Sequence, residues 1–191
     1  MKKIALCSVM AMLCLYATAQ PAIIKPLYTG DRLPDILFTQ VLNHTSNQAR
    51  LSSFQQNNQK LLLLDFWNTT CIPCIKSFKK LDSLQQVFKR ELQILLITPE
   101  DSNIVKKTID RWEKANKQKL RIPVIFGDTI LQRYIHKQYN PHYAWIAPDN
   151  VLIAQTSSSF ITPAILKTYL SQMKYEVGRR GYLKRNNTSQ R

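Results

Sequence analysis

The hydrophobic pattern of this chain is densest at residues 61–64, where four leucines follow one another. A short run of consecutive apolar residues is typical of a strand covered on both faces, as in a parallel sheet. Beyond a polar corner, apolar side chains recur at steps of three or four, which predicts an amphipathic helix. The apolar positions of this helix are Cys71, Cys74, Phe78, Leu81, Leu84 and Phe88. The pattern therefore predicts a buried strand that leads into a helix opening with two cysteines.

The rest of the pattern alternates between strands and helices. The predicted elements are a strand over residues 92–97, a helix from about 101 to 117, a strand over 122–126, a helix from 127 to about 138, strands over 143–146 and 151–155, and a closing helix over 161–173. Pro148 to Asn150 is a tight-turn sequence between the last two strands and predicts a hairpin. Ahead of the leucines, residues 36–42 predict an edge strand or hairpin arm, and residues 51–54 a helical turn. This order is typical of an α/β fold with a mixed sheet flanked by helices.

Residues 1–19 have the pattern of a cleavable export signal. Lys2 and Lys3 precede an apolar run over residues 4–16, and Ala17 to Ala19 is the small–x–small sequence that a signal peptidase recognises. The apolar run is shorter than the ~20 residues that usually span a membrane. We therefore expect cleavage after Ala19 and export to the periplasm or the exterior of the cell envelope.

Export would leave two of the four cysteines, because Cys7 and Cys14 lie in the leader. Cys71 and Cys74 close a loop too short to stabilise a fold much through chain entropy, yet one helical turn brings them close enough for a disulfide. The free N–H groups and the dipole at a helix start favour the thiolate of the first cysteine. These features predict a reversible dithiol. Two unrelated cysteines, or a zinc site completed by histidines that lack finger-like spacing, are the alternatives.

Length and charge limit the other possibilities. The 191 residues suit one domain with its own core. The formal net charge of +15 indicates affinity for acidic partners or anionic surfaces. Nucleic acid is a poor candidate, because the chain is expected to be exported and carries no recognisable binding motif. We expect a leader over residues 1–19, a lead segment over 20–28, one domain over 29–175 and a basic, flexible tail over 176–191.

The order strand, Cys-x-x-Cys helix, strand, helix, hairpin, helix resembles the thioredoxin fold. Further details resemble its exported TlpA/ResA-like branch, within the redoxin/AhpC-TSA superfamily. The matching segments are Gly30 to Asp35, Asp65 to Trp67, Cys71 to Cys74, and Tyr139 to Pro141 leading into residues 143–150. The helix near 101–117 and the strand near 122–126 match the helix–strand insertion of that branch, and the resemblance also implies an N-terminal strand extension. The resemblance covers about residues 29–170 and implies a thioredoxin-like protein-disulfide oxidoreductase that needs no cofactor and no metal.

The resemblance also implies roles for the two cysteines and for Asp65. Cys71 lies nearer the helix start and would attack a client disulfide, and Cys74 would resolve the mixed disulfide. Asp65 would be a buried acid beneath the site that moves the proton of the second cysteine, with a pKa raised by desolvation. A partly exposed aspartate at the strand end is the alternative.

Around this dithiol, the resemblance implies a substrate surface. Pro141 would be a cis-proline facing the disulfide, so that the backbone of Asn140 could pair with an extended client segment; a trans loop proline is the alternative. The expected substrate-binding residues are Trp67, Thr70, Ile72, Pro73 and Asn140. Trp67 could equally be a core residue, and His142 could touch the site or be a surface or satisfied histidine.

Two positions depart from the family pattern. Thr70 stands where these families usually have tryptophan, and Ser77 stands where ResA-like reductases often have glutamate. The redox potential and the client therefore do not carry over. The reducing direction is favoured because Pro73 directly precedes the second cysteine. We expect a monomer that acts on disulfide-containing client proteins and is re-reduced by a membrane thiol-electron donor.

Two other function classes stay open. A thiol peroxidase of the peroxiredoxin type uses Pro-x-x-x-Thr/Ser-x-x-Cys, but Leu64 and Asn68 occupy those positions ahead of Cys71. A non-catalytic copper- or thiol-binding module would use the same two cysteines, with His142 as a third ligand.

Overall fold

The computed structural model describes residues 24–55, 60–173 and 178. The expected leader over residues 1–19 and nearly all of the expected tail over 176–191 lie outside the described residues. Within the described part of the chain, no helix combines the length and the apolar character that crossing a membrane requires.

The leucine run forms the central strand, β4 (Leu61–Phe66), and all six of its residues are buried. β4 pairs in parallel with β5 (Leu92–Ile97) and antiparallel with β7 (His142–Ile146). A strand with neighbours on both sides and layers on both faces has no solvent-facing position, which explains its uninterrupted apolar sequence. The predicted strand over residues 92–97 is confirmed at both ends.

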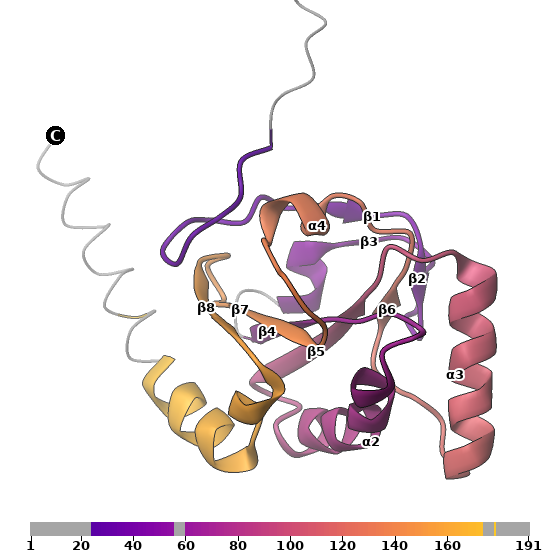
Figure 1. Ribbon diagram of the computed structural model, residues 1–191. Coiled ribbons are helices and arrows are strands. Elements are labelled where there is room, and N and C mark those ends of the chain that lie inside the picture. The colour runs from indigo at the N-terminus through magenta and orange to yellow at the C-terminus, as the bar shows by residue number, and fades with distance from the viewer. Residues whose placement is uncertain (1–23, 56–59, 174–177, 179–191) are drawn as a thin grey trace, which may run out of the picture.

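The mixed sheet has the strand order β2-β6-β5-β4-β7-β8 (Figure 1). β8 (Leu152–Thr156) forms the predicted hairpin with β7, and Asn150 takes a left-handed conformation in its turn. At the other edge, β6 (Val124–Ile125) runs parallel to β5 and β2 (Val41–Leu42) pairs antiparallel with β6. The predicted strand over residues 122–126 is thus reduced to two paired residues.

The predicted arm over residues 36–42 is split between two sheets. Its first half, β1 (Leu37–Phe38), pairs with β3 (Ala49–Arg50) in a separate two-stranded sheet, and its second half is β2. The predicted helical turn is confirmed as the 3₁₀ helix η1 (Leu51–Gln55). β1, β3 and η1 pack together over one face of the large sheet, against the side chains of Leu62, Leu64 and Phe66.

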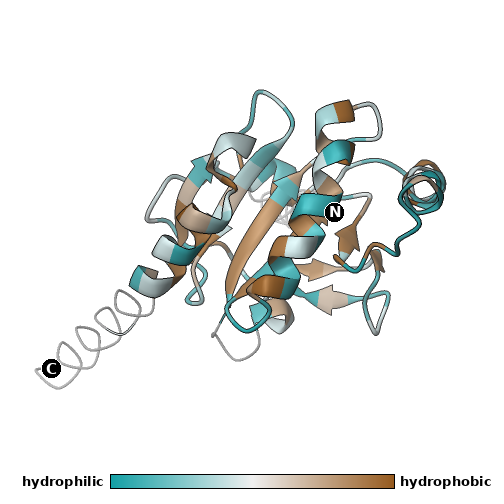
Figure 2. Ribbon diagram, turned by 90° about the horizontal axis from the view of Figure 1, so that it is seen from below, coloured by the Kyte–Doolittle hydropathy of each residue, from teal (hydrophilic) through white to brown (hydrophobic). Residues whose placement is uncertain are grey.

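Three helices pack in the core on the opposite face, two of them below the sheet and α3 (Ser102–Asn116) at the right in Figure 1. The other two are α2 (Ile72–Val87) and a helix over residues 163–173, which follows the 3₁₀ helix η2 (Ser158–Phe160). Asp101 begins α3 as predicted, by accepting a hydrogen bond from the backbone N–H of Asn103 at 2.8 Å. Apolar strands run through the interior under helices whose outer surfaces are hydrophilic (Figure 2).

The predicted helix from residue 127 to about 138 is wrong in length. Asp128 does accept hydrogen bonds from the backbone N–H groups of the next turn, but α4 (Leu131–Tyr134) ends after four residues. The side chain of Ile135 is fully buried and its backbone is extended. Burial of Ile135 therefore redirects the chain, and residues 137–140 line a cavity instead of continuing the helix.

Candidate active site

The site is built on the corner between β4 and α2. Beyond β4, the side-chain oxygen of Asn68 accepts hydrogen bonds from the backbone N–H of Thr70 at 3.2 Å and from its hydroxyl at 2.9 Å. Thr69 donates from its backbone N–H at 2.6 Å and from its hydroxyl at 2.9 Å to the two carboxylate oxygens of Glu100. These hydrogen bonds fix Thr69 and Thr70, the two residues that precede Cys71.

Cys71 and Cys74 form a disulfide with an S–S distance of 1.99 Å and a Cα–Cα distance of 5.3 Å. Cys71 is the N-cap of α2, and its sulfur accepts a hydrogen bond from the backbone N–H of Cys74 at 3.3 Å. Pro73 occupies the first turn, where a helix tolerates proline. Cys71 is half-buried and Cys74 has no exposed surface. In the reduced state, the same N–H and the helix dipole would stabilise a thiolate on Cys71.

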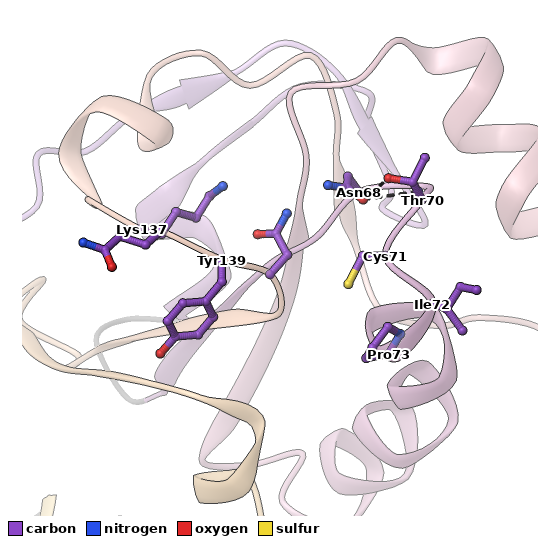
Figure 3. A pocket seen from close by; sticks show the side chains of 9 residues that line it. Asn68, Thr70, Cys71, Ile72, Pro73, Lys137 and Tyr139 are labelled. Carbon is purple, nitrogen blue, oxygen red and sulfur yellow. Dashed lines mark hydrogen bonds between the residues drawn. The ribbon is translucent and has the colours of Figure 1, made fainter.

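A cavity of about 630 Å³ opens in front of Cys71. One wall consists of the corner and the start of α2, and the other consists of residues 137–140. In Figure 3, the Cys71 sulfur lies between Pro73 at the start of α2 and the wall that carries Tyr139. Ile72 is 62% exposed and Tyr139 is 56% exposed, so each wall presents an apolar side chain to solvent. Thr70 and Pro73 are also exposed, as a surface for a client requires.

The second wall is tied to the corner through Asn140. In the amide orientation that satisfies its neighbours, Asn140 donates a hydrogen bond to the carbonyl of Phe66 at 3.1 Å and accepts one from the side chain of Asn68 at 3.1 Å. The Asn140–Pro141 peptide bond is cis, which confirms the prediction of a cis-proline at Pro141. The pairing of the Asn140 backbone with a client remains a prediction.

Asp65 lies on the buried side of the cysteine pair. It has no exposed surface, and it lies on the same face of the sheet as Leu63 and Trp67, which pack in the same core cluster as Cys74. The expectation of a buried acid is thus confirmed over that of an exposed strand end. Burial raises the pKa of this carboxyl well above its ordinary value, and the charge of Lys80 opposes that shift. Neither carboxylate oxygen has a hydrogen-bond partner in the described part of the chain.

Tyr143 is a site residue that the sequence analysis treated only as part of a strand. It lies directly opposite Asp65 in the β4–β7 ladder and is fully buried. Burial and then the charge of Asp65 raise the pKa of the Tyr143 hydroxyl. The nearby Ser77 hydroxyl is not in hydrogen-bond geometry with it, and instead donates to the carbonyl of Cys74 at 2.6 Å. Asp65, Tyr143 and Ser77 therefore form a cluster of polar side chains on the α2 side of the sheet.

Trp67 is a core residue, whereas His142 is buried and its Nδ1 has no hydrogen-bond partner in the described part of the chain, so it is neither a surface nor a fully satisfied histidine. Trp67 is 1% exposed and packs edge-to-face on Phe78 at a ring distance of 5.0 Å, so it is a core residue beneath the site and offers no surface to a substrate. His142 is 7% exposed and shares a hydrogen bond of 2.9 Å with Gln155. It lies on the opposite face of β7 from Tyr143, beside the ring of Tyr139.

The fold has counterparts among solved structures. The chain is similar to the thioredoxin domain of a thiol–disulfide oxidoreductase from Bacteroides vulgatus, with 22% identity and a TM-score of 0.54 over 69% of this chain and 89% of that one. A thiol–disulfide oxidoreductase from Bacteroides fragilis matches at 16% identity and a TM-score of 0.56, over 72% and 98% of the two chains. A yeast mitochondrial 1-Cys peroxiredoxin matches at 15% identity and a TM-score of 0.53, over 69% and 67%.

These similarities show that the fold is thioredoxin-like. No protein-family model matches the chain, and no curated protein matches it. Because the solved structures include both oxidoreductases and a peroxiredoxin, the fold leaves the reaction to be argued from the arrangement of residues at the site.

Proposed function

We propose that this protein is an exported thiol–disulfide oxidoreductase of the TlpA/ResA-like kind that reduces disulfides of client proteins. The observation that carries the proposal is the asymmetry of the cysteine pair. Cys71 faces an open cavity from a helix start, whereas Cys74 is fully buried in the core cluster of Tyr143, the ladder partner of the unpartnered Asp65. One sulfur is thereby accessible to a client, and the other is accessible only to its partner and to a proton carrier.

The reaction begins with the reduced dithiol. The Cys71 thiolate attacks one sulfur of a client disulfide, the client's S–S bond breaks, and the released client thiolate takes a proton from solvent. Cys74 then gives its proton to the Asp65 carboxylate and attacks the Cys71 sulfur, which releases the second client sulfur as a thiolate. Two electrons have moved from the dithiol to the client, and the Cys71–Cys74 disulfide has formed.

Asp65 suits the proton-transfer step because its raised pKa brings it toward the range in which a carboxyl exchanges protons with a thiol. Thr70, Ile72, Pro73 and the backbone of Asn140 would contact the client, and Pro141 would face the disulfide. Trp67 supports the site from the core.

Export and the reducing direction are further parts of the proposal. The signal-like sequence over residues 1–19 and the resemblance to an exported branch support export. Pro73 before the second cysteine supports reduction. A reductase outside the cytoplasm needs electrons from a membrane thiol carrier, which is the partner we expect.

The residues ahead of Cys71 argue against a thiol peroxidase of the peroxiredoxin type. Leu64, which stands where a peroxiredoxin has proline, is a fully buried β4 residue, and Asn68 is engaged by Thr70. The copper-module reading is tested directly by titrating Cu(I) against the reduced protein. Tight binding without disulfide exchange would favour it.

The test is insulin reduction by the full chain with dithiothreitol as the electron source. We expect Cys71→Ala to abolish turnover and Cys74→Ser to trap a mixed disulfide with the client, while the exposed Ser83→Ala variant keeps wild-type activity. The reduction potential should lie nearer the roughly −270 mV of thioredoxin than the roughly −120 mV of a strong oxidant. Unchanged turnover by Cys71→Ala would overturn the proposal.

A further inference from the structure

A second concavity, of about 400 Å³, lies between α2 and α3 and is separate from the cavity in front of Cys71. We call it the α2–α3 groove. Its apolar lining is Ile75, Trp112 and Ala115, and Trp112 is 6% exposed. Three cationic side chains also line it, namely Lys76 and Lys79 from α2 and Arg111 from α3. All three are exposed, so the groove combines an apolar lining with a cationic rim.

No acidic residue lines the groove in the described part of the chain. The four ion pairs found there use Arg32, Arg50, Lys119 and Arg121, so the cations of the groove are not paired internally. The neighbouring Asp110 lines a different cavity, on the side of α3 where Lys119 lies. The groove therefore has three positive charges that the fold leaves unbalanced.

The position of the two lysines on α2 does not stabilise the helix. Lys76 and Lys79 lie in the N-terminal half of α2, far from the C-terminal turn where the helix dipole favours positive charge. No acidic residue occupies the first turn of α2. A cluster that does not help the helix, and has no internal partner, is explained if an anionic ligand contacts it.

The groove adjoins the active-site cavity at the corner. Thr69 lines the groove, and the next residue, Thr70, lines the cavity in front of Cys71. Adjacent Cα atoms are about 3.8 Å apart, so a client chain whose disulfide sits at Cys71 can extend across the corner into the groove within a few residues. Glu100 holds that corner in place through Thr69.

We propose that the α2–α3 groove binds the segment that flanks the client's disulfide, and that this segment carries acidic residues and one apolar anchor. This inference rests on the proposed function and names its substrate class. The apolar side chain contacts Trp112, Ile75 and Ala115, and the carboxylates pair with the rim. A concave site suits a protruding side chain, whereas an anionic membrane presents a plane.

The experiment compares two disulfide-containing peptides that differ only in the flank, which carries one leucine with three glutamates or one leucine with three glutamines. We expect the full chain to reduce the glutamate peptide with a kcat/KM about tenfold higher, through KM, because three exposed ion pairs of modest strength add up to about that factor. The preference should weaken in 0.3 M salt, where the Debye length is shorter.

The combined variant Lys76→Gln, Lys79→Gln, Arg111→Gln should lose this preference and keep the wild-type rate on the glutamine peptide. The matched control is Lys25→Gln, Lys89→Gln, Lys167→Gln, which removes the same charge from exposed positions outside the groove and should keep the preference.

Each other result overturns a defined part of the argument. Equal reduction of both peptides by the wild type rejects the groove and leaves the proposed function standing, whereas failure to reduce either peptide rejects the function. Loss of the preference in both variants assigns it to net charge. Groove-dependent binding to phosphatidylglycerol vesicles, without a peptide preference, assigns the surface to the membrane instead.

Discussion

Two fully buried aspartates in this protein have opposite surroundings. Asp82, on α2, accepts hydrogen bonds from the side chain of Gln118 at 3.0 Å, from the backbone N–H of Arg121 at 3.1 Å and from the Arg121 guanidinium group. Asp65, on β4, is equally inaccessible, yet neither of its carboxylate oxygens has a donor in the described part of the chain. The same side chain is satisfied at one position and unsatisfied at the other.

The difference separates a structural group from a chemical one. The Asp82 bonds join α2 to the segment after α3, so this carboxylate contributes to the stability of the fold. A buried carboxylate without partners instead destabilises the fold unless it takes up a proton. Asp65 lies on the face of the sheet that α2 and Cys74 cover, so a carboxyl that holds a proton is useful there. Such a strongly shifted pKa is a recognised mark of functional sites.

The largest effect that follows from this comparison concerns Asp65→Asn. We expect the resolution of the mixed disulfide to slow by about a hundredfold at neutral pH, the lower end of the range for general acid–base catalysis. The first attack, by Cys71, should be nearly unchanged. Stopped-flow measurement of the two steps separates these effects. A variant in which both steps slow equally would indicate a disturbed site rather than a lost proton carrier.

The same substitution gives a second readout through stability. The raised pKa means that folded Asp65 holds its proton at pH values where the unfolded chain has lost it, so wild-type stability falls as the pH rises from about 3.9 through the raised pKa. Asparagine removes this dependence. The variant should match the wild type near pH 4 and exceed it at higher pH, by about 1.4 kcal/mol for each unit of pKa shift. Denaturant titrations at several pH values measure it, and a constant difference would contradict the assignment.

Asp82→Ala, at the hydrogen-bonded carboxylate, should lower stability and leave activity nearly unchanged. We expect the free energy of unfolding to fall by about 2 kcal/mol, because several hydrogen bonds are lost while the half-exposed Arg121 can be hydrated. Insulin reduction should stay within about twofold of wild type. Asp110→Ala, an exposed position on α3, is the control for stability. A large loss of activity in a folded Asp82→Ala protein would remove the distinction between the two aspartates.

The sequence predicts the parts of this site that depend on local signals. The leucine run and the apolar run over residues 92–97 define β4 and β5 because strands covered on both faces have no polar positions. Cys71 at the helix start follows from helical periodicity and from Pro73. The cis bond before Pro141 and the burial of Asp65 followed from the family resemblance.

What the sequence does not predict depends on contacts between distant segments. Glu100 clamps Thr69 from 31 residues away, and Asp82 meets Arg121 from 39 residues away, and neither pair has a local signature. The end of α4 is set by the burial of Ile135. The sequence does place Tyr143 on the same face of its strand as Trp145, because the two residues are two positions apart. Its pairing with Asp65, however, requires the register between β4 and β7. The groove cations likewise become a cluster only when α2 and α3 pack together.

The smallest effect tests whether the group around Asp65 includes a second member. Tyr143→Phe removes only a hydroxyl that has no hydrogen-bond partner, so stability should hardly change. The Asp65 carboxylate would lose a nearby dipole, which should raise its pKa further and slow the resolution step by about threefold. The pH at which that step reaches half its maximal rate should rise, with Lys80 and Ser77 unchanged as its other polar neighbours. Tyr134→Phe, the same change on the opposite face of the sheet, should leave the pH profile unaltered. If the pH profile of Tyr143→Phe matched that of Tyr134→Phe and the wild type, the Tyr143 hydroxyl would have no part in proton transfer by Asp65.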